Sequence, residues 1–506
     1  MADLNEKDIG SDDGSGTTGP PEYTERPKGF RGLYSHPSVQ VAMVGLVCFM
    51  CPGLFNSLSG IGGGGQENEV TGANTNVALY STFAVMAFFA GSINNMLGSR
   101  LTLQLGSLGY CLYIAGFLSL NLHPGADGSG TKAATSFCIA TGAILGVCAG
   151  LLWTAQGSLM LAYPTEQNKA KYIALFWVIF NLGGVVGSAV AFGQNFNTKA
   201  GSVNNSTYIV FLVLTLVGAT IPMFMVDPRK MIRTDGTRVS IARNPSWKVE
   251  VWGLYVALKT DPMILLLFPM FFASNWFYTW QFNEYNGVLF NIRTRSLDSM
   301  LYWSAQIVGS LIMATVLDKK NVSRRTRAFT GWGITMVMVF VCHGWAYHYQ
   351  KTYTRESIAA IAATDRIDFS DKQYVGKIFL YIFFGILDAM WQTSVYWMMG
   401  AMSNDPNKLA YFTGFYKSIQ SAGAAGAWRA DAVLIPFMNM FAATWALCAA
   451  GLLFALPMIY LRVKEHTELE DETIARMGEH GQILPVSEIM PQVEGTVGRP
   501  VEKEGV

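Results

Sequence analysis

The stretch TSFCIATGAILGVCAGLLWTAQGSLM, residues 135–160, contains no charged side chain and decides the class of the fold. About 20 apolar residues in a helix are enough to cross the ~30 Å hydrocarbon core of a bilayer. This run reaches that length without a proline to interrupt it. It therefore predicts a transmembrane helix. Its glycines Gly142, Gly146 and Gly150 recur every four residues, which predicts a smooth face for close contact with a neighbouring helix.

Apolar runs of similar length recur along most of the chain. The predicted spans, about twelve, are residues 38–58, 76–97, 101–122, 135–160, 171–193, 208–226, 263–284, 298–317, 328–347, 376–399, 409–428 and 434–461. A long polar link separates the first six runs from the last six. The pattern predicts an all-α polytopic membrane protein made of two six-helix halves.

The composition agrees with this fold class. Hydrophobic residues make up 51% of the 506 residues and charged residues 14%, whereas soluble domains have about 25% charged residues. The net charge of +1 gives no reason to expect a nucleic acid partner, and the expected surroundings are a lipid bilayer. The sequence shows no zinc-binding spacing and no nucleophile motif, so we expect neither an enzyme nor a metal or cofactor.

The spans imply a division of the chain into five parts. They are a disordered cytoplasmic tail (1–35), an N-terminal six-helix half (36–226), a cytoplasmic linker (227–262), a C-terminal six-helix half (263–461) and a second cytoplasmic tail (462–506). The first tail lacks the basic and apolar segments of a signal peptide. The end of the linker, residues 246–259, predicts a helix on the membrane surface or an ordinary solvated helix.

Basic residues orient the spans. They are numerous in the link 227–262 and after the eighth span, and they are absent from residues 59–75. Cytoplasmic loops collect Lys and Arg, so both termini are predicted to be cytoplasmic. The overlapping glycosylation sequons at Asn204 and Asn205 then lie outside. The glycine run at residues 62–65 is interpreted as a flexible external loop.

Two short basic turns, after the second and eighth spans, resemble each other. Their residues are Gly91, Asn95, Gly98 and Arg100 in the first, and Asp318, Lys319, Arg324 and Arg325 in the second. Basic side chains there can bind the C-terminal carbonyl groups of helices. The pattern resembles the gating turns of the major facilitator superfamily, although Asn95 replaces the acid. The alternative is an anchor at the cytoplasmic interface without a gating role.

A closer resemblance rests on strings that occur in a fixed order. They are Cys51-Pro52-Gly53-Leu54-Phe55-Asn56, Trp153-Thr154-Ala155-Gln156-Gly157, Phe176-Trp177, Asn181-Leu182-Gly183-Gly184 and Pro269-Met270-Phe271-Phe272-Ala273-Ser274-Asn275-Trp276. Together they resemble the uncoordinated-93-like (Unc-93-like) family, in its fungal-type branch. The resemblance implies a major-facilitator fold. It leaves the activity open, since members are described as ion-channel regulators, as escorts for receptor trafficking and as presumed transporters.

Polar residues inside spans are costly and usually face the interior of the bundle. Asp388, in the tenth span, is the only acid that the predicted spans place deep in the membrane, and Lys417 lies well inside the eleventh. We expect a buried pair between them. Such a pair would act as a protonatable switch or a substrate anchor. The alternatives are a purely structural pair, or a Lys417 side chain that extends to the interface instead of pairing.

Other polar and aromatic residues share helix faces with these two. A polar and aromatic cavity between the halves is predicted to contain Asn56, Trp153, Gln156, Trp177, Asn181, Asn275, Tyr278, Gln281, Asp388, Gln392, Lys417 and Gln420. Few of them are charged, which favours a neutral or weakly polar organic ligand. The alternative for each residue alone is a hydrogen bond between helices with no ligand.

These residues and turns are compatible with two functions. One is a secondary transporter of a small organic solute, moving by alternating access and linked to protons through Asp388. The other is a regulator or trafficking escort that binds another membrane protein. A channel is disfavoured because no ring of pore-lining groups is evident.

Overall fold

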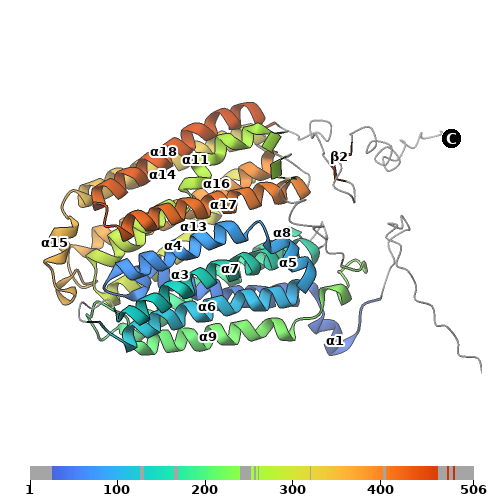
Figure 1. The fold of residues 1–506 in the computed structure, drawn as a ribbon. Coiled ribbons are helices and arrows are strands. Elements are labelled where there is room, and N and C mark those ends of the chain that lie inside the picture. The colour runs from blue at the N-terminus through green and yellow to red at the C-terminus, as the bar shows by residue number, and fades with distance from the viewer. Residues whose placement is uncertain are drawn as a thin grey trace, which may run out of the picture.

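The chain forms a bundle of long helices in which two halves lie side by side (Figure 1). The structure is a computed structural model, and it describes residues 25–125, 130–164, 169–239, 252, 254–255, 258–259, 261–319, 321–402, 406–464, 476–477 and 483–484. In Figure 1 the first half runs from blue to green and the second from yellow-green to red. Each half has its own apolar core.

The first half begins with a short helix and continues as six long crossings. Its elements are α1 (Gly29–Tyr34), α2 (Pro37–Cys48), the π-helical η1 (Phe49–Gly53), α3 (Leu54–Ile61), η2 (Gly63–Gly65), α4 (Glu69–Met86), α5 (Ala90–Leu97), α6 (Ser99–Leu122), α7 (Lys132–Ala162), α8 (Lys169–Asn195), α9 (Asn205–Phe224) and η4 (Pro228–Lys230). The α4–α5 pair is one broken crossing, bent by 70°.

The second half repeats this arrangement. Its elements are η5 (Pro262–Leu267), α11 (Phe268–Ala273), α12 (Trp276–Tyr278), the π-helical η6 (Thr279–Gly287), α13 (Ile292–Leu317), α14 (Arg324–Gln350), α15 (Arg355–Ala359), η7 (Ala363–Asp365), α16 (Tyr374–Met402), α17 (Pro406–Ala432) and α18 (Phe437–Arg462). Two antiparallel two-residue strands follow, β1 (Arg476–Met477) and β2 (Ile483–Leu484).

The number of crossings agrees with the sequence. Within the described residues, ten helical segments are long and apolar enough to cross a membrane, and the bent pair α4–α5 makes eleven. Helix α17 is of similar length, 27 residues, but it carries charged residues including Lys417, Arg429 and Asp431. With α17 included, the fold has the predicted two sets of six crossings.

Local sequence signals explain how the helices begin and pack. The side chains of Thr131 and Asn291 accept hydrogen bonds from backbone N–H groups in the first turns of α7 and α13, which are N-cap interactions. At Gly146 a side chain could not fit, because its Cβ would lie 2.1 Å from the carbonyl oxygen of Leu79 in α4. This confirms the predicted close contact along the glycine face of α7.

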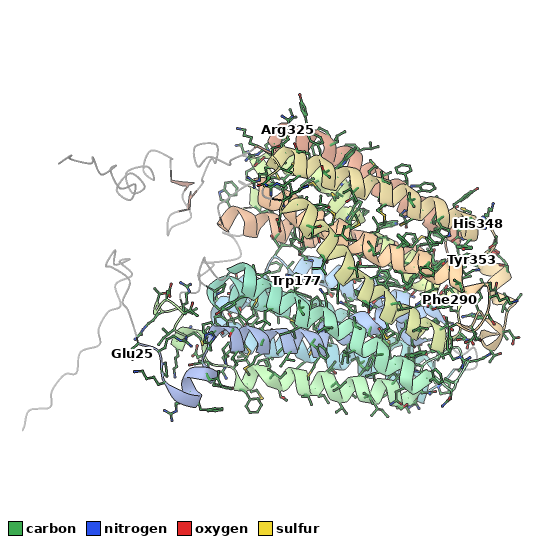
Figure 2. The ribbon with its side chains drawn as sticks, turned by 180° about the vertical axis from the view of Figure 1, so that it is seen from behind. Glu25, Trp177, Phe290, Arg325, His348 and Tyr353 are labelled. Atoms are coloured by element: carbon green, nitrogen blue, oxygen red, sulfur yellow. The ribbon has the colours of Figure 1, made fainter. Side chains whose placement is uncertain are left out.

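The halves meet along α4 and α17 and along α8 and α13. Figure 1 shows α1 and the C-terminal end of α18 at one end of the bundle, here called the termini end, and α15 at the other, the α15 end. In Figure 2 Arg325 lies near the termini end, and Tyr353 and His348 near the α15 end. Which end faces the cytoplasm stays a prediction.

Two expectations need correction, and one falls largely outside the described chain. Residues 29–34, which the predicted disordered tail was to include, form helix α1, and residues 1–24 of that tail lie outside the described residues. The glycine run 62–65 is wrong as a flexible loop, since all four residues are buried. The surface helix expected over residues 246–259 lies mostly outside the described residues.

Candidate functional site

Asp388 lies in α16 and is 1% exposed. Its Oδ2 accepts hydrogen bonds from the hydroxyls of Tyr278 (2.9 Å) and Tyr302 (3.1 Å) and from the amide of Gln306, and its Oδ1 accepts one from Gln392 (3.4 Å). These donors come from α12, α13 and α16. All four are neutral, and within the described chain no cation forms an ion pair with Asp388.

The hydroxyl of Tyr302 lies within hydrogen-bond distance of two acceptors but has only one proton to donate. It lies 2.8 Å from Oε1 of Gln281 and 3.1 Å from Oδ2 of Asp388. When Asp388 is ionised, Tyr302 can donate to it. When Asp388 is protonated, the acid can donate to the oxygen of Tyr302, which then donates to Gln281. The site therefore accommodates both protonation states of Asp388 without moving the backbone.

The network continues from Asp388 into α17. Oε1 of Gln392 accepts from the hydroxyl of Tyr416 (2.5 Å) and from Nε2 of Gln420 (3.4 Å). Gln420 also donates to Oδ1 of Asn275 (2.9 Å) and accepts from Nζ of Lys417 (3.0 Å). A chain of neutral amides and hydroxyls thus connects Asp388 to Lys417.

The predicted direct pair between Asp388 and Lys417 is wrong. The Lys417 ammonium packs over the rings of Tyr416 and Tyr396, 5.1 and 5.7 Å from their centroids. Gln392 and Gln420 occupy the space between the two charges. The helices do place both residues in one network, but cation–π contacts and an amide stabilise the ammonium in place of the carboxylate.

A small cavity of about 10 Å³ adjoins Asp388 inside the second half. It is lined by Phe277, Gln281, Val339, His343, Leu387, Asp388, Trp391 and Cys448. This volume is close to that of a single water molecule measured in the same way. The cavity has room for a water beside the carboxylate and none for an organic solute.

The structure joins the site residues of the second half and leaves those of the first half apart. One network contains the predicted site residues Asn275, Tyr278, Gln281, Asp388, Gln392, Lys417 and Gln420.

The predicted site residues of the first half are separate from this network in the described part of the chain. Trp153 packs edge-on against Phe180, at 5.4 Å between centroids. Trp177 is 39% exposed on α8, nearer the termini end (Figure 2). Asn56, Gln156 and Asn181 are half-buried. A cavity between the halves stays a prediction.

Sequence reasoning missed three members of the network: Tyr302, Gln306 and Tyr416. Tyr302 and Gln306 are four residues apart in the eighth predicted span and so share a helix face. That spacing was a signal for the site. Tyr416 directly precedes Lys417, and only the tertiary structure places its hydroxyl on Gln392.

The halves are sealed together at the α15 end. The guanidinium of Arg295, in α13, donates to the carbonyl oxygens of Ile61 (2.8 Å), Gly62 (2.6 Å), Gln66 (3.2 Å) and Gly201 (2.9 Å). From η6, Asn283 accepts from the N–H of Gly63 (2.7 Å) and Asn286 donates to the carbonyl of Gly60 (2.8 Å). We call this contact of residues 60–66 with Asn283, Asn286 and Arg295 the seal.

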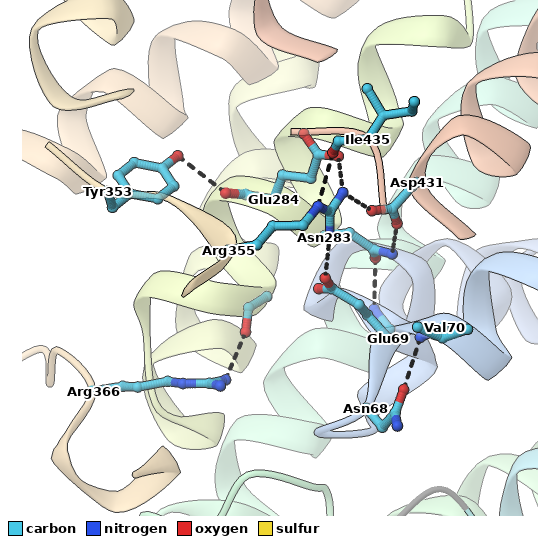
Figure 3. A network of polar contacts seen from close by, with 12 residues as sticks. Asn68, Glu69, Val70, Asn283, Glu284, Tyr353, Arg355, Arg366, Asp431 and Ile435 are labelled. Atoms are coloured by element: carbon cyan, nitrogen blue, oxygen red, sulfur yellow. Dashed lines mark hydrogen bonds and ion pairs between the residues drawn. The ribbon is translucent and has the colours of Figure 1, made fainter. Parts of the chain in front are cut away.

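Beside the seal, Arg355 of α15 binds three carboxylates (Figure 3). It contacts Glu69 of α4 (2.9 Å), Glu284 of η6 (2.9 Å) and Asp431 of α17 (2.8 Å), and its Nε donates to the carbonyl of Ile435 (2.8 Å). Burial works against the charged form of Arg355, but the three carboxylates outweigh it and raise its pKa.

Asp388 shares its burial with two other acids in the predicted membrane crossings, neither of which the sequence placed deep in the membrane. Glu284 and Asp298 lie in helical segments that qualify as membrane crossings, and their side chains are fully buried. Asp298 accepts a hydrogen bond from the hydroxyl of Tyr374 (2.6 Å). The sequence placed both acids at the ends of predicted spans, where water was expected, and the packing of η6 and α13 removes them from it.

The two basic turns bind helix ends as predicted. Arg100 donates to the carbonyl oxygens of Pro222 (3.2 Å) and Met223 (2.6 Å) at the end of α9. Arg324 donates to the carbonyl of Gly400 near the end of α16 (3.2 Å). Arg325 stacks on Tyr460, 4.4 Å from its centroid.

The other turn residues lie at the helix ends where the sequence placed them. Gly98 has a φ of +78° between α5 and α6, Gly91 lies in the first turn of α5, and Asp318 follows the last residue of α13. Asn95 is in α5 and Lys319 follows Asp318. A gating role for these turns stays a prediction.

The sequons lie at the α15 end. Asn204 is the N-cap residue of α9 and Asn205 its first residue, and both side chains are exposed. Gly201, three residues earlier, contacts Arg295 in the seal. The sequons are thus at the end opposite the termini, and glycosylation stays a prediction.

Comparison with known proteins decides the family. Residues 65–426 match the family described as "Ion channel regulatory protein UNC-93". This chain belongs to the UNC-93 family. An UNC93-like protein of Schizosaccharomyces pombe is 48% identical over 447 residues, which cover 88% of this chain and 86% of that one. UNC93-like protein 1 of Arabidopsis thaliana is 39% identical over 438 residues, 86% and 92% of the two chains.

Solved structures establish the fold of this UNC-93 family chain. A D-xylose–proton symporter matches with a TM-score of 0.54 at 12% identity, covering 86% of this chain and 99% of the symporter. The xylose transporter XylE of E. coli, in a partially occluded inward-open conformation, matches with a TM-score of 0.55 at 13% identity, covering 87% and 100%. The predicted major-facilitator fold is confirmed. At this identity the likeness concerns the fold alone.

Proposed function

We propose that this UNC-93 family chain is a secondary transporter that moves a small organic solute by alternating access, with Asp388 as the site that couples transport to protons. The observation that carries the proposal is the carboxylate of Asp388, which is buried among four neutral hydrogen-bond donors and forms no ion pair with any described residue. An ionised carboxylate is costly inside a membrane protein and is usually functional. Here Tyr302 and Gln281 provide partners for both the ionised and the protonated form.

The groups that extend from Asp388 favour a neutral or weakly polar solute. Asn275, Gln392 and Gln420 present amides, and Tyr278 and Tyr416 present hydroxyls. Here they bond Asp388 and one another beside a cavity with room only for a water, and in a conformation that opens this site they would donate to and accept from the alcohols and amides of a solute. The fold is consistent with this reading, because the matched D-xylose–proton symporter has the same architecture.

The test is solute transport by the purified protein in liposomes. Uptake and efflux from a broad metabolite mixture are followed by mass spectrometry, with and without a pH gradient. We expect at least one solute to move in the wild type, faster with the gradient. In Asp388→Asn the acceleration by the gradient is lost. A solute that moves equally well in Asp388→Asn, with the same gradient dependence, would exclude Asp388 as the coupling site.

A second candidate function is the regulation of another membrane protein. It is supported by the name of the matched family, "Ion channel regulatory protein UNC-93". If folded and correctly oriented protein moves no solute in the liposome experiment, the regulator becomes the better proposal. The next measurement is then chemical cross-linking in native membranes, with partners that co-purify identified by mass spectrometry.

A further inference from the structure

Three carboxylates converge on one guanidinium at the α15 end (Figure 3). Glu284 and Asp431 both contact Nη2 of Arg355, and Glu69 contacts Nη1. The side chains of Glu284 and Asp431 are 0% exposed, that of Arg355 13% and that of Glu69 18%. Glu69 belongs to the first half and the other two acids to the second. The cluster therefore bridges the halves beside the seal.

The other charged groups nearby do not balance the three acids by direct contact. Arg295 donates to main-chain carbonyls, and Arg366 donates to the carbonyl of Gly287 (3.3 Å). Arg429 contacts Oδ1 of Asn74 (3.4 Å), and Glu67 is exposed to solvent. In the described part of the chain, Arg355 is the sole cation paired with Glu69, Glu284 or Asp431.

Glu284 is the acid for which a negative charge is least well accommodated. Its Oε1 accepts from Arg355, but its Oε2 is buried, and no group in the described part of the chain donates a hydrogen bond to it. Both oxygens of Asp431 have a hydrogen-bond donor, since its Oδ1 accepts from Arg355 and its Oδ2 accepts from Asn283 (2.8 Å). A buried anionic oxygen without a donor is costly, and the neighbouring carboxylate on the same nitrogen adds repulsion. A proton on Oε2 removes the negative charge, which lowers the first cost and ends the repulsion, and it leaves the bond from Arg355 to Oε1 intact.

We propose that closing the seal binds a proton on Glu284, so that the Arg355 cluster is a proton site controlling access from the α15 end. The proton comes from water at that end and bonds to Oε2 of Glu284. Opening the seal exposes Glu284 to water, where it releases the proton. Lower pH therefore stabilises the closed seal, and higher pH favours opening. The proposal does not depend on transport of any solute.

The experiment measures opening directly, through a cysteine beneath the seal. Ser299 is fully buried in α13, where its hydroxyl contacts Ser188 (2.9 Å) and the carbonyl of Ser57 (3.2 Å), both in the first half. The Ser299→Cys protein in liposomes is exposed to a membrane-impermeant maleimide between pH 6 and pH 9. Labelling is read by peptide-resolved mass spectrometry and normalised to denatured protein at the same pH. The seven natural cysteines serve as internal controls.

We expect labelling of Ser299→Cys to be about tenfold faster at pH 9 than at pH 6. One linked proton allows at most a tenfold change in the opening equilibrium for each pH unit. Adding Glu284→Gln, which mimics the protonated acid, keeps labelling slow at every pH. Adding Arg355→Gln leaves the acids without their cation and makes labelling fast at every pH. Asp365→Asn is the matched control, since it removes an exposed carboxylate in the loop after α15 and should leave the profile unchanged.

Two results would overturn the proposal. One is a flat profile in the Ser299→Cys protein, including no labelling at any pH. The other is fast labelling in Glu284→Gln, equal to that in Arg355→Gln, which would show that the seal requires an ionised Glu284. Monodisperse size-exclusion profiles for each variant exclude misfolding as the cause. Because no solute is involved, failure here leaves the liposome transport test of Asp388 unaffected.

Discussion

Arg295 in the second half donates a 2.6 Å hydrogen bond to the carbonyl oxygen of Gly62 in the first half. Arg295 is 1% exposed, and its four hydrogen bonds within the described residues all go to main-chain carbonyls. This contact converts a run of glycines into a rigid part of the interface between the halves. It also joins the two halves at the α15 end.

Replacement of Arg295 by Gln should destabilise the protein by about 2–5 kcal/mol, since hydrogen bonds to a charged group contribute about 1.5–3 kcal/mol each and the carbonyls are left unpaired. Arg295→Lys should be intermediate, because a lysine cannot reach the carbonyls with the fork of a guanidinium. Thermal unfolding of the detergent-purified proteins checks the order. An Arg295→Gln protein as stable as the wild type would contradict the role of this residue in the seal.

Gly62 and Gly98 form a matched pair for a test of the seal. Their backbones are nearly the same, with φ and ψ of +85° and 146° at Gly62 and +78° and 150° at Gly98. A Cβ at Gly62 would lie 2.2 Å from the carbonyl of Phe282, whereas at Gly98 nothing lies within 4 Å. Both Ala variants should lose about 1–3 kcal/mol from backbone strain. Gly62→Ala should lose more because of the clash, and equal melting temperatures would show that the close approach is unimportant.

Tyr302→Phe should destabilise the protein more than Tyr278→Phe. The first removes a hydroxyl shared by Gln281 and Asp388, and the second a hydroxyl that, among the described residues, donates to Asp388 alone. An unpaired buried polar group costs about 1–3 kcal/mol. In a double-mutant cycle with Asp388→Asn, Tyr302→Phe should show a coupling energy of about 0.5–3 kcal/mol. Additive effects in the cycle would mean that the two side chains do not interact.

The stability contribution of Asp368 should depend on pH only in the acid range. Burial alone would raise the pKa of Asp368, but hydrogen bonds from Arg293, Ser370 and Asn291 hold it well below its usual range. A depressed pKa in the folded state stabilises the protein above the unfolded value of about 3.9, and this contribution is lost as pH falls below it.

Asp368→Asn should therefore cost about 3 kcal/mol at pH 7, as expected for a broken buried ion pair. The difference from the wild type should persist to about pH 4 and shrink only below it. Thermal unfolding at pH 7, 5 and 3.5 measures this. Asp365→Asn is the control, because Asp365 is exposed in the same loop and contacts only Thr364 among the described residues. A difference that disappears between pH 7 and 5 would contradict the prediction.

The candidate site was only partly predictable from sequence. Asp388 stands out because an acid in an apolar run is costly wherever the run folds. Its partner did not follow from the sequence. The prediction that Lys417 pairs with Asp388 relied on charge and depth alone. In the structure, the face of α13 that is turned toward α16 places Tyr302 and Gln306 on the carboxylate instead.

The sequence by itself determined that this is a polytopic membrane protein of two similar halves. That property depends on the length and hydropathy of each run, which are local, because a bilayer selects apolar helices one segment at a time. Only the tertiary structure decided which polar groups meet. Gly62 and Arg295 are 233 residues apart, and Glu69 and Arg355 286. A glycine run is flexible in isolation, and it becomes rigid here because the second half supplies donors for its carbonyls.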